Sequence, residues 1–415
     1  MVKWKSQDKN LKALPKARLK KYNLHWNKIS LMETFLISIL AFALTAGQLI
    51  RIPLGQGGIT ILDITVFIFS LAALINLKFK TKRPPQHILA AFIFIAVMIL
   101  SLIFSPLDLN SSEYLTCFFY TLRFLMYIIF GWLIYLDAFN LKKESFRILL
   151  ISGVSFAVLG LLQFIFFPNL DFLQIAGWDP HYFRTVSTFL DPNFAGSFLV
   201  LTLIIILNFR HEPIMTPRVF GLLFFIVYLA LLTTFSRSGY LMFLVSGMTF
   251  SFFKRSKIYF ASTLVLFITL LLGFQIYTQL VTKPRNIDRT QSATSRLDTW
   301  QQGLALFQKS PFLGVGFNAY RYALRENRLG DEQFLASHGS SGNDSSLLFV
   351  LSTTGILGLL SYLYFLWSLV KSSGMKNVTL IAALIGLFVH SFFANSLFYS
   401  PILAWVLLTS LNPKK

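Results

Sequence analysis

The chain has 415 residues, of which 55% are hydrophobic and 13% are charged, and its mean hydropathy is +0.64. Because a soluble domain carries roughly a quarter charged residues, this composition excludes an ordinary soluble protein. The formal net charge is +20, but the positive residues gather in a tail and in short turns, so we expect no nucleic-acid partner. The single Cys117 lies in an apolar run, and the six histidines show no ligand spacing, so we expect neither a disulfide framework nor a metal site.

Apolar runs of about 20 residues recur from end to end, and each is long enough to cross a bilayer. They predict an all-α polytopic membrane protein with about twelve transmembrane helices. The expected spans are 29–50, 59–77, 87–105, 113–137, 146–167, 194–209, 218–234, 238–252, 258–280, 346–370, 376–397 and 399–411. The chain then divides into a basic tail at 1–28, spans one to nine within 29–280, a large polar loop at 281–345, and spans ten to twelve within 346–415.

Positive residues are distributed unevenly between alternate turns. With the N-terminus inside, 25 of the 37 Lys and Arg residues fall in the inner segments, and every inner turn is basic. The positive-inside rule therefore predicts cytoplasmic N- and C-termini and places the 281–345 loop outside. A polar excursion of this length between membrane helices suggests a functional role.

Two arginines lie where an anionic ligand would suit them. In TTFSRSGYL (233–241), Arg237 stands between two apolar runs, where a guanidinium costs free energy unless it meets water, a partner or an anion. In SATSRLDTWQQGLALF (292–307), an apolar stripe at helical spacing predicts a helix with Arg296 in it. The alternatives are an interfacial turn residue for Arg237 and, for Arg296, a solvated position on a helix that lies on the membrane.

The residue at which the helix predicted within 292–307 begins decides the surroundings of Arg296. Ser295 or Thr294 is suited to cap it, which would set Arg296 in the first turn beside free backbone N–H groups. Farther along, SPFLGVGFNAY (310–320) carries Pro and Gly residues that predict a tight turn, a better interpretation than a phosphate loop.

Two residues before span ten are able to accept a proton near neutral pH, His338 and Asp344. The alternatives are a solvated loop residue for His338 and the N-cap of span ten for Asp344. We expect the helix start and nearby arginines to lower the basicity of Asp344, and we expect His338 to lie in a mobile Gly/Ser-rich loop.

The second outer loop contains RTVSTFLDPNFAGSFL (184–199). Arg184 adds a cation on the outer side, and Asp191-Pro192-Asn193 predicts a turn that caps span six. Two lone charges inside spans, Asp63 and Arg123, are expected to pair, because an unpaired charge in a bilayer is costly.

These motifs occur together in a particular order, and with them the chain resembles the O-antigen ligase / O-antigen polymerase superfamily of bacterial membrane glycan transferases. The matching pieces are Pro-Asn at 192–193, Ser-Arg-Ser-Gly at 236–239, Arg-x-x-x-Trp at 296–300, Ser-Pro-Phe-x-Gly-x-Gly at 310–316 and Thr-Gly-Ile-Leu-Gly at 354–358. The resemblance implies a polyprenyl-diphosphate-linked glycan donor, a glycan or lipid acceptor, no metal or other cofactor, and the bacterial cytoplasmic membrane. It also implies that Arg237 and Arg296 face the donor diphosphate. From its place on the outer side, we expect Arg184 to add a further cation there.

The chain departs from the family where the family has His-Asn before span ten. Here Asp344 and Ser345 stand at that position, and the nearest histidine is His338. Either Asp344 or His338 would then activate the acceptor, and we favour Asp344. The third alternative is that the chain lacks ligase activity. The alternative classes are a lipid-linked glycan or solute transporter, for which mid-membrane polar residues and internal symmetry would be expected, and a scaffold of envelope assembly.

Overall fold

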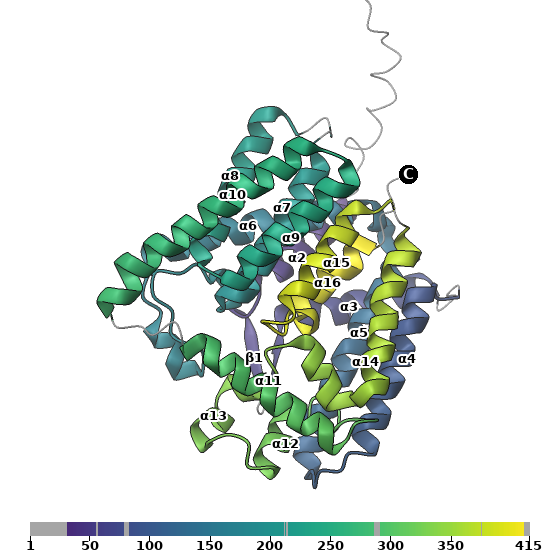
Figure 1. The fold of residues 1–415 in the computed structure, drawn as a ribbon. Coiled ribbons are helices and arrows are strands. Elements are labelled where there is room, and N and C mark those ends of the chain that lie inside the picture. The colour runs from purple at the N-terminus through teal and green to yellow at the C-terminus, as the bar shows by residue number, and fades with distance from the viewer. Residues whose placement is uncertain are drawn as a thin grey trace, which may run out of the picture.

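A computed structural model describes residues 31–54, 57–78, 83–210, 212, 215–285, 291–374 and 376–410 (Figure 1). Within these residues each of the twelve expected spans coincides with one helix. These helices are α2 (Leu31–Ala46), α3 (Ile61–Asn76), α4 (Gln86–Ile103), α5 (Ser111–Tyr135), α6 (Ser145–Phe166), α7 (Pro192–Phe209), α8 (Pro217–Thr234), α9 (Arg237–Lys254), α10 (Lys257–Tyr277), α14 (Ser346–Ser373), α15 (Val378–His390) and α16 (Ser400–Ser410).

Seven helices of the described chain are long and apolar enough to cross a membrane, namely α4, α5, α6, α7, α8, α10 and α14. Four more, α2, α3, α15 and α16, are apolar but shorter. The chain is thus a helical multi-pass membrane protein, whereas the twelve crossings and their orientation stay predictions.

Polar capping residues set the beginnings of several helices. Thr60 with Asp63 and Asn110 with Glu113 form capping boxes at α3 and α5. At α7, the Asp191 carboxylate accepts from the backbone N–H groups of Asn193 and Phe194, with Pro192 in the first turn. The N-cap that the sequence predicts for Asp191 is confirmed.

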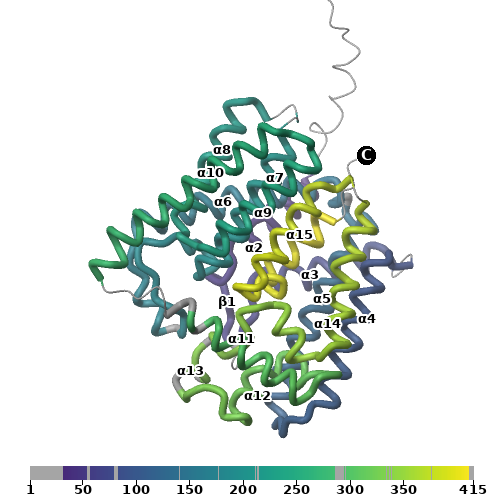
Figure 2. The backbone as a smooth tube through the Cα atoms, viewed as in Figure 1, coloured from purple at the N-terminus to yellow at the C-terminus, as the bar shows by residue number. Residues whose placement is uncertain are grey.

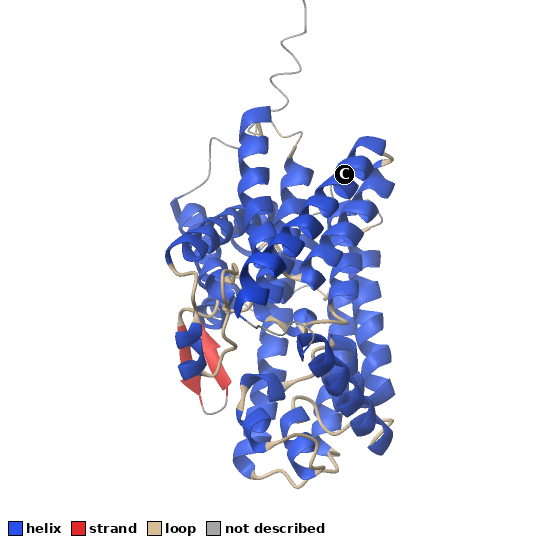
Figure 3. Cartoon of the chain, turned by 60° about the vertical axis from the view of Figure 1, so that its left-hand side comes forward, coloured by secondary structure: helices blue, strands red, loops and turns tan. Residues whose placement is uncertain are grey.

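A short β-hairpin precedes α3 and was not expected from the sequence. Strands β1 (Arg51–Leu54) and β2 (Gly57–Thr60) pair antiparallel, with Arg51 opposite Thr60 (Figure 3). The signal was present as Ile52 and Ile59 on either side of a Gly-rich turn. The apolar run that reaches from 59 into the helix resembles one continuous span and masks this signal.

The expected outer loop is largely helical. It contains α11 (Gln291–Lys309), α12 (Tyr320–Glu326) and α13 (Glu332–Ala336), which lie at the end of the molecule opposite the end of α16 (Figure 1). The cap predicted at Thr294 or Ser295 is wrong, because α11 already begins at Gln291 and Arg296 lies in its second turn. No Pro or Gly separates 291 from 296, so nothing in the sequence delays the helix.

Helix α14 packs along α4, which is far from it in sequence (Figure 2). The backbone of α14 is also interrupted, and the 311–316 turn, here called the clasp, forms hydrogen bonds to the interrupted segment. Gly355 interrupts α14 with φ 65° and ψ −166°. The freed carbonyls of Ser352 and Thr353 accept from Val315 and Gly316, both at 3.0 Å. The freed N–H of Ile356 donates to Pro311 at 2.9 Å, so the 311–316 turn replaces the hydrogen bonds that the break removes.

Candidate functional site

A cavity of about 490 Å³ lies where the hairpin, α5, the loop before α7, the 291–345 region and the α15–α16 turn meet. Its charged lining residues are Arg51, Arg123, Arg296, Arg321, Asp179, Asp191 and Asp344, and its aromatic ones include Tyr120, Trp178, Tyr322, Phe393 and Tyr399. A space of this volume is typical of a site for a small molecule or part of a larger one.

Asp344 faces this cavity, because the residue after it caps α14. Ser345 is the N-cap, and its side chain accepts from the backbone N–H of Leu348. The Asn343 side chain accepts from the Ser345 N–H at 2.9 Å, which fixes the turn into the helix. The alternative reading of Asp344 as the N-cap is therefore wrong, and its carboxylate accepts from the Thr299 hydroxyl of α11 at 3.4 Å instead.

The surroundings of Asp344 raise its basicity, contrary to expectation. Burial raises the pKa of Asp344 above its ordinary value, the charge of Arg296 opposes this, and the like charge of Asp191 adds to it. The effect of desolvation on the pKa of Asp344 is larger than that of the Arg296 charge. Asp344 lies in the cavity wall, and the first turn of α14 is capped by Ser345 instead. The result is a carboxylate better suited to take a proton near neutral pH than an ordinary aspartate.

Tyr320 ties the elements around Asp344 together. Its hydroxyl donates to the Thr299 carbonyl at 3.2 Å and accepts from the Asn343 amide at 2.9 Å. Gly303 allows the close approach, because a Cβ there would lie 2.7 Å from the Asn343 Nδ2. Helices α11 and α12 and the start of α14 are thus held as one wall.

Arg296 acts on two of the other candidate groups. It lines the cavity, opposes the rise in the pKa of Asp344 that burial causes, and adds to the partial desolvation that lowers the pKa of Arg237. Arg237 opens α9, is exposed, and lies over the Phe274 ring at 6.0 Å. The structure thus brings Arg237 close enough to Arg296 for their charges to interact, but Arg237 does not line the cavity itself.

Arg184 has a different position from the other two arginines. Its guanidinium is buried and donates to the carbonyls of Thr234 at 2.9 Å and Phe235 at 3.3 Å. Phe235 ends α8 in the left-handed region with φ 47°, which costs a non-glycine residue on the order of 1 kcal/mol. Arg184 stabilises this strained turn directly before Arg237, and it does not line the cavity.

Asn193 links the turn before α7 to the start of α9. Its amide oxygen accepts from the hydroxyls of Ser236 at 2.8 Å and Ser238 at 3.3 Å. Gly196 and Gly239 let the two helices approach closely, since a Cβ at Gly239 would lie 3.3 Å from the Gly196 Cα. Two separate sequence motifs, 192–193 and 236–239, are therefore one structural joint that positions Arg237.

His338 begins η7 (His338–Ser341), whose later residues Gly339 and Ser341 line the cavity. The His338 side chain lies outside the described part of the structure. Its role as the base therefore stays a prediction beside that of Asp344.

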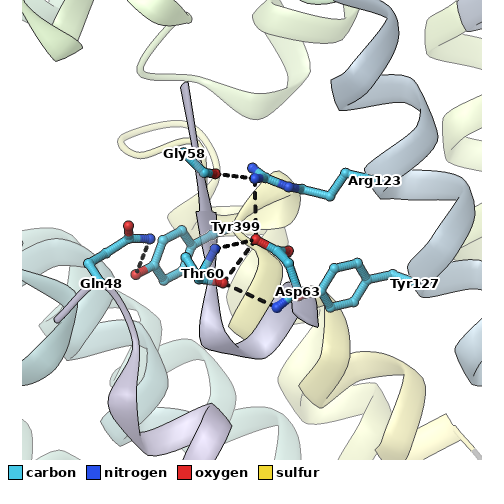
Figure 4. A network of polar contacts seen from close by, with 7 residues as sticks. All are labelled: Gln48, Gly58, Thr60, Asp63, Arg123, Tyr127 and Tyr399. Carbon is cyan, nitrogen blue, oxygen red and sulfur yellow. Dashed lines mark hydrogen bonds and ion pairs between the residues drawn. The ribbon is translucent and has the colours of Figure 1, made fainter. Parts of the chain in front are cut away.

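Asp63 and Arg123 form a salt bridge at 3.2 Å, as the sequence predicts (Figure 4). Asp63 is in the first turn of α3, where it also accepts from Tyr127 at 3.0 Å, and Arg123 donates to the Gly58 carbonyl. Arg123 also lines the cavity. The pair thus connects the hairpin, α3 and α5 at the cavity wall.

Arg51 and Arg321 were not singled out by sequence reasoning, although both line the cavity. Each lies in a segment expected outside the membrane, where an arginine carries no distinguishing signal. Only the fold brings them together with Arg123.

Comparison with known proteins agrees with this arrangement. A family model described as O-antigen ligase matches residues 222–363, from within α8 to within α14, and so includes Arg237, Arg296, His338 and Asp344. No curated protein matches the chain. Residues 222–363 of the chain are therefore similar to the O-antigen ligase family.

Proposed function

We propose that this protein transfers a glycan from a polyprenyl diphosphate carrier to a glycan or lipid acceptor at the outer side of the bacterial cytoplasmic membrane. The observation that carries the proposal is the position of Arg296 and Asp344 on one cavity, with Arg237 close enough to Arg296 for the two charges to interact. A cation for a leaving diphosphate and a base for an acceptor are the two groups that this reaction needs.

The chemistry is a displacement at the anomeric carbon of the donor. The acceptor hydroxyl forms the new glycosidic bond as the bond from that carbon to the diphosphate oxygen breaks. The hydroxyl proton passes to Asp344, and the polyprenyl diphosphate leaves with the bonding electrons. Arg296, assisted by Arg237, stabilises the negative charge that develops on the diphosphate, and Arg184 acts indirectly by holding the turn before Arg237.

The test is a transfer assay with the purified full chain in nanodiscs and a lipid-linked glycan donor. Because lysine keeps the charge but lacks the planar fork, Arg296→Lys and Arg237→Lys should reduce transfer at matched protein levels. Arg325→Lys is the control, since Arg325 is exposed, pairs with Glu113 and does not line the cavity. Full activity in both variants would refute the proposed role of the arginines.

The base is tested by comparing Asp344→Asn with His338→Gln in the same assay. We expect Asp344→Asn to lose most transfer, because the amide cannot take the proton. Asp298→Asn, an exposed change on α11, is the control. Full activity of Asp344→Asn with loss in His338→Gln would assign the base to the histidine.

A transporter is distinguished by its product. If the protein moves lipid-linked glycan across the vesicle membrane without forming a new glycosidic bond, the transferase proposal is wrong and the alternative class holds.

A further inference from the structure

Three arginines that the proposed transfer step does not use lie along one wall of the cavity. This cationic wall consists of Arg51 from β1, Arg123 from α5 and Arg321 from α12. No two of these elements are neighbours in sequence, so the grouping is a product of the fold.

The first two members of the cationic wall meet at Gly58. Arg123 donates to the Gly58 carbonyl, and a Cβ at position 58 would overlap the Nε of Arg51 (Figure 4 shows the Arg123 side). Glycine at this position therefore allows the Arg51 side chain to cross the hairpin toward Arg123. The Arg51 guanidinium also lies 6.0 Å from the Trp178 ring centre.

The second and third members are both within electrostatic reach of Tyr120. The Arg123 guanidinium lies 5.0 Å from the centre of the Tyr120 ring, and Tyr120 and Tyr322 are the neighbours that oppose the effect of burial on the pKa of Arg321. Arg321 is held in place by donating to the Ser340 hydroxyl and the Ser337 carbonyl, both at 2.7 Å. The cationic wall thus combines three guanidinium groups with aromatic rings in the lining of one cavity.

Charges other than those of the cationic wall act on the proposed reacting groups. The charges that shift the pKa of Asp344 are Arg296, Asp191 and Asp179, and the charge that shifts the pKa of Arg237 is Arg296. A diphosphate next to Asp344 would accordingly be served by Arg296, which leaves the wall for another part of the substrate.

We propose that the cationic wall binds an anionic substituent of the glycan, a carboxylate or phosphate carried by a sugar ring, and so makes this protein selective for acidic glycans. The inference rests on the proposed function and names the substrate class of that same site. Arginine binds carboxylate and phosphate groups through paired hydrogen bonds, while Tyr120, Trp178 and Tyr322 offer flat faces to sugar rings. An anion in the cavity also offsets the cost of holding guanidinium groups away from water.

Binding of soluble probes to the full chain in nanodiscs tests this without relying on transfer. The carboxylate probe is a tetrasaccharide containing glucuronic acid, and its partner is the same tetrasaccharide with the carboxyls reduced to alcohols. A third probe is the neutral tetrasaccharide bearing a phosphate. We expect the acidic probes to bind about tenfold more tightly than the neutral one, which is the size of effect of a charge-assisted hydrogen bond.

Arg321→Gln should abolish that preference for acidic probes over the neutral one. Arg325→Gln on the same helix is the matched control and should keep the preference, because Arg325 lies outside the cavity. Since Arg123 supports the fold through Asp63, its contribution is tested in the double variant Asp63→Asn/Arg123→Gln, which leaves neither charge alone. Equal binding of acidic and neutral probes by the unmodified protein, or a preference that persists in Arg321→Gln and in the double variant, overturns the inference.

Geranyl diphosphate as a fourth probe separates this inference from the proposed function. Arg296→Lys should weaken its binding and Arg321→Gln should not. If Arg321→Gln weakens geranyl diphosphate binding as strongly as Arg296→Lys, the cationic wall belongs to the diphosphate site and the inference fails, while the proposed transfer stands.

Discussion

The N-cap of α14 is Ser345 and not Asp344, and this difference of one residue decides the surroundings of the Asp344 carboxylate. Ser345 caps α14, so the Asp344 carboxylate is released from the helix end and meets Thr299 and the charge of Arg296 in the cavity. Its pKa then depends on burial and on the surrounding charges, among which Asp191 raises it. Asp191 itself is occupied as the cap of α7.

Asp191→Asn is therefore expected to shift the pH profile of transfer. Asparagine caps a helix as well as aspartate, so α7 should remain intact. Removing a like charge lowers the pKa of Asp344, which keeps this base ionised to lower pH, so the acidic limb of the rate profile should move downward. Rates measured across pH check this, with Asp298→Asn as the unshifted control. An acidic limb that stays in place or moves upward would contradict the role of Asp344 as the base.

At the scale of elements, two sets of contacts between distant segments hold together the helices around the cavity. The 311–316 turn fills the break in α14 at Gly355, and the Asp63–Arg123 salt bridge connects α3 with α5. Both sets of contacts supply partners to polar groups that would otherwise be buried alone, so both are expected to contribute to stability.

Gly355→Ala tests the clasp. With φ 65° and ψ −166°, Gly355 occupies a backbone region essentially limited to glycine, and the added methyl would also overlap the Phe312 carbonyl, so thermal stability should fall clearly. Gly221→Ala on α8 is the matched control, because an added Cβ there meets nothing within 4 Å and alanine favours a helix. Thermal unfolding in detergent measures both. Equal stability of the two variants would mean that the clasp is not required.

Arg123→Leu tests the ion pair. It leaves the buried Asp63 without its cation, and breaking a buried pair typically costs about 3–5 kcal/mol, so less folded protein should reach the membrane. Replacing both residues, as in Asp63→Leu/Arg123→Leu, should recover part of the loss, because no lone charge remains. The amount of folded protein after extraction is the measurement. If Arg123→Leu accumulates normally, the pair is not needed for folding and Arg123 serves only the cavity.

At the scale of the whole molecule, the region from α11 to α13 lies at the end opposite the end of α16 (Figure 1). The basic turns gather on the side of the C-terminal end in the predicted topology, which sets the cavity on the outer side. Glycan transfer from a lipid carrier would then occur where the diphosphate meets water.

Cysteine labelling checks this orientation in intact cells. The one natural cysteine, Cys117, is buried, so a new cysteine should dominate the signal. An impermeant reagent should label a cysteine at Ser341, next to the cavity, and should not label one at Ser256 in the α9–α10 turn. The reverse labelling pattern would overturn the topology and, with it, the proposed site of the reaction.

The sequence alone determined the helical membrane class and the approximate limits of the twelve helices, because long apolar runs and capping residues such as Asp191 act locally. It also pointed to the Asp63–Arg123 pair, since isolated charges among apolar residues need a partner. The β1–β2 hairpin has a local signal in the sequence, but the neighbouring apolar run continues into α3 and hides it.

The tertiary structure decided how distant residues share one space. Arg51, Arg123 and Arg321 come from three separate elements, and nothing in their local sequence indicates that they line one cavity. The burial of Arg184 under the α8–α9 turn and the raised pKa of Asp344 likewise depend on which groups are excluded from water. Sequence patterns report the local preferences of the backbone, whereas desolvation and charge proximity arise only when segments far apart in the chain pack together.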